Sequence, residues 1–266
     1  MAWANKGGAG THTDPCGLKP GVLHLWLCVM DEADGATLAS RLSAILSPDE
    51  RKRSLRLRRA VDRHRFVASH AFVRLALSRH CAVEASRWRF DRTAEGKPFV
   101  VTPNLPQAPV FSLSYTKGMA ACLIGLSARA GVDVEKLAYH RDLPGIASSI
   151  LSARELQNLR GHFGADWTTR FFQYWTLKEA YAKARGLGLR LRLGDVTFEI
   201  AADGAIRGNF AAALRDDPSR WLFRSYRPWP THVLSLAVAA PSEIVVRPIS
   251  FETLHAASWT NRLEAS

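Results

Sequence analysis

One helix-start signal occurs twice in this chain, and its spacing constrains the fold more than any other feature. In the first copy, residues 46–50, Ser47 can cap a helix, Pro48 suits the first helical position and Glu50 lies three residues after the cap. The second copy is Leu151-Ser152-Ala153-Arg154-Glu155, which lies 151 − 46 = 105 residues later. Two helices are therefore expected to begin in the same way in two parts of the chain.

Two longer helical patterns repeat at the same spacing of 105. One begins at Arg65-Phe66-Val67 and runs to about His80, and the other begins at Arg170-Phe171-Phe172 and runs to about Arg185. We predict an internal duplication that gives an α+β fold, with two similar α/β subdomains related by pseudo-two-fold symmetry and the active site in the cleft between them. The alternative is chance similarity between short amphipathic helices.

Flanking strands complete each predicted half. Apolar runs at Val22–Met30 and Met119–Leu126, and the alternating stretch Gly131–Glu135, are typical of strands. The expected organisation is a loose leader over residues 1–20, an N-terminal subdomain over 21–128, a C-terminal subdomain over 129–245 and an extension over 246–266. None of the apolar runs approaches the roughly 20 residues needed to cross a bilayer.

The charge balance favours an anionic partner. Lys and Arg number 36 against 24 Asp and Glu, which gives a formal charge of +12. The four cysteines, Cys16, Cys28, Cys81 and Cys122, have no CxxC spacing. We therefore expect neither a zinc site nor a disulfide framework, and a cytoplasmic, reducing location.

The stretch Gly131-Val132-Asp133-Val134-Glu135 is the first with chemical character. Alternation along a strand puts Val132 and Val134 on one face and Asp133 and Glu135 on the other. Two carboxylates converging in this way suit Mg²⁺, which takes one or two carboxylates and substrate phosphates. The alternative is a solvated strand face.

The second stretch lies on the later long helix. Trp175, Glu179 and Lys183 follow one another at steps of four and so share one helix face. A glutamate four residues before a lysine is usually a surface pair, but the tryptophan on the same stripe argues against full exposure.

Basic and hydroxyl side chains supply the remaining signals. The turn Gly96-Lys97-Pro98 would fix a lysine in place, and the strand Phe111–Thr116 is dense in hydroxyls. A basic run suits phosphate oxygens as well as it suits a solvated helix face. Its members between residues 51 and 65 are Arg51, Lys52, Arg53, Arg56, Arg58, Arg59, Arg63 and Arg65.

Taken in order, these segments resemble the 4′-phosphopantetheinyl transferases of the surfactin-synthetase-activating (Sfp-like) type. The resemblance covers about Val22 to Ala240, and its most specific part pairs GVDVE with WTLKEAYAK some forty residues later. It implies a Mg²⁺-dependent transferase that moves the phosphopantetheine arm of coenzyme A to a serine of an apo acyl or peptidyl carrier protein and releases 3′,5′-ADP. The acceptor could serve fatty acid, polyketide or nonribosomal peptide synthesis.

The resemblance also implies site residues. Asp133, Glu135 and Glu179 would be the metal-side carboxylates. The catalytic residues would be Glu179, which could be the general base, a metal ligand or both, and Lys183, which could stabilise or protonate the departing phosphate. By the 105-residue offset Glu179 falls opposite Arg74, which predicts one acidic and one basic helix. The residues implied for coenzyme A are Arg53, Lys97, Ser114, Tyr115 and Lys183.

Two positions depart from the family pattern. Tyr115 stands where many relatives have His, and Glu50 stands where some have Lys. The segment Leu137–Arg160, with Arg141, Arg154, Ile146, Ile150 and Leu151, corresponds to the region that contacts carrier proteins in the family, or else packs on the second subdomain.

Two other functions stay open at this point. A nucleic-acid-binding protein would use the basic run of residues 51–65, and a degenerate transferase would bind coenzyme A or carrier protein without catalysis. The preferred interpretation is a monomeric enzyme that engages neither nucleic acid nor membrane.

Overall fold

The computed structural model describes residues 16–30, 35–126, 129–138, 142–239 and 243–250. Its helices are α1 (Gly35–Leu42), α2 (Pro48–Leu55), α3 (Ala60–Ser78), α4 (Leu143–Ile150), α5 (Ala153–Leu159) and α6 (Gly164–Arg185). Its strands are β1 (Val22–Val29), β2 (Arg89–Arg92), β3 (Pro98–Thr102), β4 (Val110–Thr116), β5 (Met119–Gly125), β6 (Ala130–Lys136), β7 (Val196–Ile200), β8 (Ile206–Phe210), β9 (Trp221–Trp229), β10 (His232–Ala239) and β11 (Glu243–Ser250).

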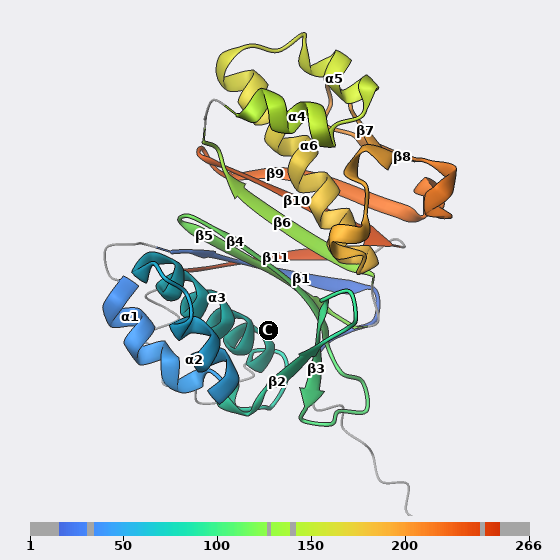
Figure 1. The fold of residues 1–266 in the computed structure, drawn as a ribbon. Coiled ribbons are helices and arrows are strands. Elements are labelled where there is room, and N and C mark those ends of the chain that lie inside the picture. The colour runs from blue at the N-terminus through green and yellow to red at the C-terminus, as the bar shows by residue number, and fades with distance from the viewer. Residues whose placement is uncertain (1–15, 31–34, 127–128, 139–141, 240–242, 251–266) are drawn as a thin grey trace, which may run out of the picture.

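The elements form two stacked halves, each with a sheet and a long helix (Figure 1). In the first half α3 packs on a four-stranded sheet of order β11-β1-β5-β4, and in the second α6 packs on a three-stranded sheet of order β6-β10-β9. The hairpins β2-β3 and β7-β8 are separate two-stranded sheets. The α+β class and the two-half arrangement predicted from the sequence are confirmed.

The inner faces of the two large sheets share one apolar core. Along β5, Ala120, Cys122 and Ile124 face α3, while Ala121 and Leu123 face the other sheet. Successive side chains on a strand point to opposite faces, so a strand buried on both sides joins two cores. Residues of both sheets fill the inter-sheet layer, namely Leu23, Leu25, Met119, Ala121, Leu123, Ala130, Val132, Val134, Leu234, Leu236 and Val238.

Both predicted capping boxes are present. Ser47 Oγ accepts from Glu50 N and Glu50 Oε2 accepts from Ser47 N, and Ser152 and Glu155 make the same two bonds at the start of α5. The long helices begin earlier than expected, at Ala60 and Gly164. The first turns of both helices contain polar residues that are also common in loops. A search for apolar periodicity therefore does not detect these helix starts.

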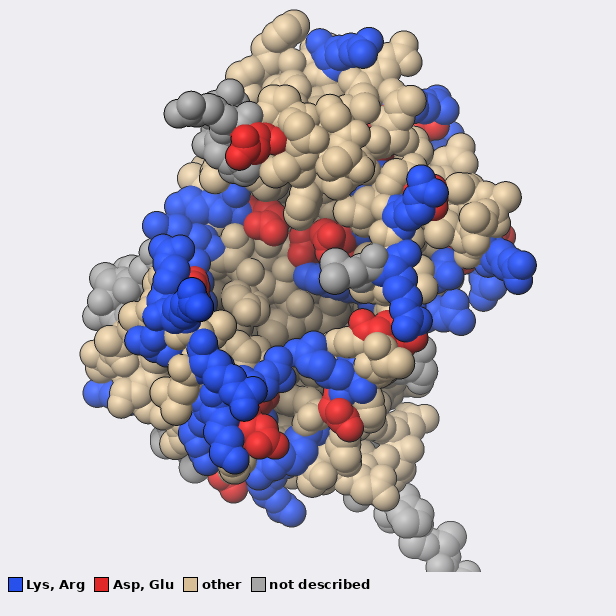
Figure 2. Space-filling view, in the orientation of Figure 1, with Lys and Arg blue, Asp and Glu red and all other residues tan. Residues whose placement is uncertain are grey.

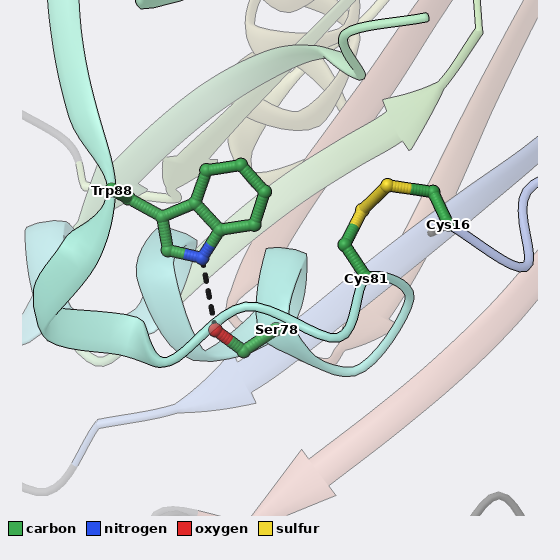
Figure 3. Close-up of a disulfide and its surroundings, with 4 residues drawn as sticks. All are labelled: Cys16, Ser78, Cys81 and Trp88. Carbon is green, nitrogen blue, oxygen red and sulfur yellow. Dashed lines mark hydrogen bonds between the residues drawn. A yellow bond between two sulfur atoms is a disulfide. The ribbon is translucent and has the colours of Figure 1, made fainter. Parts of the chain in front are cut away.

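The expectation about cysteines was wrong. Cys16 and Cys81 form a disulfide across a sequence separation of 65 residues, at the end of α3 (Figure 3). Gly17 N donates to His80 O at 2.7 Å, and Leu18 is buried in the first core. The described end of the predicted leader, residues 16–20, is therefore attached to the first half, and the cysteine argument for a reducing compartment loses its premise. Residues 1–15 lie outside the described part.

The last described strand crosses back to the first half. β11 pairs in parallel with β1, from Val22 opposite Glu243 to Val29 opposite Ser250. The expected boundary between the second subdomain and a C-terminal extension, at residues 245 and 246, falls inside this strand, whose backbone completes the first sheet. In the described part of the chain, every helix is too short or too polar to span a bilayer.

Candidate functional site

β6 and α6 meet along the face that the alternation of GVDVE predicted. Val132 and Val134 enter the inter-sheet core, while Gly131 faces α6 so closely that a Cβ there would lie 2.1 Å from Ala180 O. The absence of a side chain at Gly131 lets the helix rest on the strand. Asp133, on the same face as Gly131, is buried beneath α6.

A three-membered polar network fixes one oxygen of Asp133. Lys183 Nζ donates to Asp133 Oδ1 at 2.7 Å and to Ser114 Oγ at 2.9 Å, and Ser114 Oγ donates to Asp133 Oδ1 at 2.7 Å. The second carboxylate oxygen, Asp133 Oδ2, is buried and has no hydrogen-bond partner among the residues that the structure describes. An orphaned buried carboxylate oxygen is costly unless a cation or donor completes it.

Two further carboxylates lie close enough to Asp133 to feel its charge. Burial, followed by the charge of Asp133, raises the pKa of Glu135 to about 7, and the same two causes in the same order raise the pKa of Glu179. Thr116 Oγ1 donates to Glu135 Oε2 at 3.2 Å. The charges of the three carboxylates expected at the site therefore act on one another across β6 and α6.

The fit of these residues to a divalent cation depends on how many ligands the cation needs from the protein. Within the described ranges, no three His, Cys, Asp or Glu side chains lie close enough together to enclose a metal ion. Mg²⁺ does not need such a closed set, because it usually keeps waters and takes one or two carboxylates and substrate phosphates. Asp133 Oδ2, a hard oxygen donor that is buried without a hydrogen-bond partner among the described residues, fits that requirement.

A pocket of about 450 Å³ opens beside this network and is lined by both halves. In Figure 2 the molecule is hollowed at its centre, with acidic side chains above the hollow and basic ones on its left and lower rim. Four of the residues implied for coenzyme A line the pocket, namely Arg53, Lys97, Tyr115 and Lys183. Ser114 is outside the lining and reaches the site through its bond from Lys183.

Part of this pocket is lined by aromatic side chains that were not predicted from the sequence. Phe66 and His70 stack with ring centroids 3.8 Å apart, and Phe90 lies 5.0 Å from Phe111. His70 Nδ1 is bonded to Phe66 O at 2.9 Å, so this nitrogen carries the proton. The i, i+4 spacing of Phe66 and His70 was the available signal, but it is also the spacing of ordinary core residues.

The two departures from the family pattern have different surroundings. Tyr115 is 39% exposed and lines the pocket, where burial raises its pKa although Arg53, Arg92 and Lys183 lie near enough to oppose the shift. Glu50 instead turns inward, where its Oε2 accepts from Arg74 Nε at 3.1 Å. Glu50 thus belongs to the core of the first half, and it is absent from the pocket lining.

The predicted carrier-contact segment folds as α4 and α5. Its apolar residues Ile146, Ile150 and Leu151 pack on the core of the second half, as the packing alternative expected. Arg154 is exposed and pairs with Glu199 at 2.8 Å, so this basic side chain faces solvent. Arg141 lies outside the described residues.

Comparison with known proteins identifies the family of this chain. The family model of the 4′-phosphopantetheinyl transferase superfamily matches residues 129–238, which include β6 and α6. The chain is 32% identical over 167 residues to the 4′-phosphopantetheinyl transferase HetI of Nostoc sp., covering 63% of this chain and 70% of that protein.

Two further relatives extend the match over more of the chain. A phosphopantetheinyl transferase of Thraustochytrium sp. is 29% identical over 256 residues, covering 88% of each chain. The 4′-phosphopantetheinyl transferase Sfp of Bacillus subtilis is 27% identical over 202 residues, covering 76% of this chain and 85% of its own. The chain belongs to the 4′-phosphopantetheinyl transferase superfamily, and it is an enzyme that transfers the phosphopantetheine arm of coenzyme A to carrier proteins.

Proposed function

We propose that coenzyme A binds in the pocket between the halves, with its phosphates on Arg53, Lys97, Tyr115 and Lys183, and that Asp133, Glu135 and Glu179 hold Mg²⁺ beside them. The observation that carries this proposal is Asp133 Oδ2, a buried carboxylate oxygen without a partner next to the basic end of the pocket. The acceptor is the serine of an apo acyl or peptidyl carrier protein.

The basic rim supports a phosphorylated ligand more than a nucleic acid. Arg51 Nη1 donates to Leu46 O and Arg63 Nη1 donates to Leu57 O, so two members of the basic run hold the backbone. Arg53 lines the pocket, where a guanidinium suits a phosphate group. Glu50, one of the two departures from the family pattern, accepts from Arg74 and is not among the residues that line the pocket.

The protein groups have distinct roles in the transfer. The serine oxygen attacks the β-phosphorus of coenzyme A, its proton passes to Glu179, and the bond from that phosphorus to the 3′,5′-ADP oxygen breaks. Glu179 suits the role of base because its raised pKa favours proton uptake and no described group donates to its carboxylate. Bound Mg²⁺ would neutralise charge on the pyrophosphate oxygens.

Lys183 stabilises the negative charge of the departing phosphate. Its ammonium lines the pocket and its side chain is 30% exposed, so the group can donate to a phosphate oxygen as negative charge develops there. Lys97 extends from the first half and donates to Ala184 O at 3.2 Å, which places a second cation beside the end of α6. Such fixed donors favour the transition state when the charge they meet is greatest there.

Incubation of the protein with coenzyme A, Mg²⁺ and an apo carrier protein tests the proposal. We expect the carrier to gain the mass of one phosphopantetheine arm, and Glu179→Gln and Lys183→Ala to slow the gain while the variants remain folded. An unchanged transfer rate in Glu179→Gln would remove Glu179 from the mechanism. Equal rates with acyl and peptidyl carriers would indicate a broad acceptor range.

A further inference from the structure

Three hydroxyl side chains of β4 face β6, although the two strands belong to different sheets. Ser112 Oγ accepts from Val132 N at 3.2 Å, Ser114 Oγ bonds Asp133 Oδ1 at 2.7 Å and Thr116 Oγ1 bonds Glu135 Oε2 at 3.2 Å. Alternate residues of a strand share a face, so the three hydroxyls of β4 all point toward β6 and reach it between Val132 and Glu135. β4 therefore holds β6 through side chains.

The direction of the Thr116 bond is fixed by its neighbours. Lys136 N donates to Thr116 Oγ1 at 3.4 Å, so the hydroxyl oxygen acts as an acceptor there and its single proton goes to Glu135 Oε2. Among the described residues, no other group donates to the Glu135 carboxylate. The hydroxyl of Thr116 therefore supplies the one hydrogen bond from a described residue that orients the Glu135 carboxylate.

Glu135 needs a fixed orientation because two like charges lie near it. Asp133 lies two residues away on the same strand face, and the charge of Glu179 also acts on Glu135, while Lys183 acts in the opposite sense. Like charges at this spacing favour turning of the longer side chain away from the cluster. A donor on Oε2 opposes that rotation and leaves Oε1 available to a cation.

We propose that Thr116 is a positioning residue for the magnesium site, acting through Glu135 without touching metal or substrate. This inference rests on the proposed metal role of Glu135. Ser114 cannot be assigned in the same way, because its bond from Lys183 couples it to the pocket. Thr116 is not among the residues that line the pocket, and its side-chain hydrogen bonds go to β6, so its effect on the cation is separable from binding of coenzyme A.

The test measures Mn²⁺ binding to the full chain by electron paramagnetic resonance, with Mg²⁺ titration calorimetry in parallel. Thr116→Val keeps the shape and removes the hydroxyl, and it is expected to weaken Mn²⁺ binding by about 10-fold, as loss of a group that orients a metal ligand does. Thr116→Ser keeps the hydroxyl and is expected to restore the affinity. Thr197→Val, on β7 and far along the chain, is the matched control and should bind Mn²⁺ as the wild type does.

Several results would overturn the inference. Wild-type Mn²⁺ affinity in Thr116→Val would show that the hydroxyl does not position Glu135, and equal loss in Thr116→Val and Thr116→Ser would assign the effect to packing. A thermal melt identifies unfolding, and an unfolded Thr116→Val with a folded, fully binding Thr116→Ala would also overturn it. Glu135→Gln separates the two proposals. If it binds Mn²⁺ normally, the metal role of Glu135 fails, whereas weakened binding there beside normal binding in Thr116→Val contradicts the positioning role alone.

Discussion

Each half of the molecule has a buried ion pair, and the two pairs occupy equivalent positions. In the first half Glu50, the third residue of α2, pairs with Arg74 of α3, and Arg74 also donates to Trp88 O. In the second half Glu155 of α5 pairs with Lys178 of α6 at 2.8 Å, and Lys178 donates to Leu193 O. The capping-box glutamate thus joins the short helix of each half to its long helix.

This comparison corrects the expected counterpart of Arg74. The sequence offset placed Glu179 opposite Arg74 and predicted one acidic and one basic helix, but the structural equivalent is Lys178, one residue earlier. Both long helices therefore carry a buried cation at this point. The two helices differ in the residues that follow this buried cation. In α6, Glu179 and Lys183 face the site, whereas α3 continues with the buried residues Leu75, Ala76 and Leu77.

The largest expected effect is on the buried pair of the second half. Lys178→Met leaves Glu155 charged in a site where both side chains have 0% exposure, and it should lower the free energy of unfolding by about 3–5 kcal/mol in urea titration. Arg74→Met should cost less, because water reaches the 10% exposed Glu50 side chain. Equal losses in the two variants would mean that the halves do not differ in desolvation.

The next largest effect is on the turnover number, and a matched variant separates it from an effect on stability. Asp133→Asn should lower the turnover number on the order of 10²–10³-fold, since it removes the charge of the proposed metal ligand. The residue 105 positions earlier is Cys28, which is fully buried in β1. Cys28→Ala should cost about 1 kcal/mol of stability and leave turnover near the wild-type value. A normal turnover number in folded Asp133→Asn would contradict the inference that this position of the second half serves catalysis while its counterpart in the first half serves stability.

Acid sensitivity should arise from the first half. Burial lowers the pKa of His70 from 6.5 to about 4, so the folded state holds this imidazole neutral while the unfolded chain takes up a proton. The stability contribution is complete above pH 6.5 and is lost as the pH falls from 6.5 to 4. His70→Gln should remove about 2 kcal/mol of that acid-induced loss, measured as urea unfolding at pH 7 and pH 4.5. An identical pH slope in the variant would show that other groups cause it.

The smallest effect concerns an exposed pair on the same short helix that carries Glu155. The side chains of Arg154 and Glu199 are 66% and 42% exposed. Arg154→Ala should change the free energy of unfolding by less than about 0.5 kcal/mol, because water screens such a pair. The carrier KM measured on this variant tests the segment expected to contact the partner. A stability loss near that of Lys178→Met would undo the contrast between buried and exposed pairs.

Local signals in the sequence carried much of the fold and of the candidate site. The capping boxes, the apolar strands and the alternation around Asp133 and Glu135 depend on neighbours a few residues away, so their patterns are visible in the chain itself. The repeat of such patterns at one offset then predicted two halves. Motif resemblance supplied Arg53, Lys97, Tyr115 and Lys183, and these residues line one pocket.

Contacts between distant segments were decided by the tertiary structure. The Cys16–Cys81 disulfide, the parallel pairing of β11 with β1 and the bond from Thr116 to Glu135 join residues with no local relation. Glu50 shows the same limit, because the sequence gives its charge but only packing shows that it faces Arg74. Periodicity fixes which side of a helix or strand a residue occupies, whereas its partner depends on how the two halves close around their shared core.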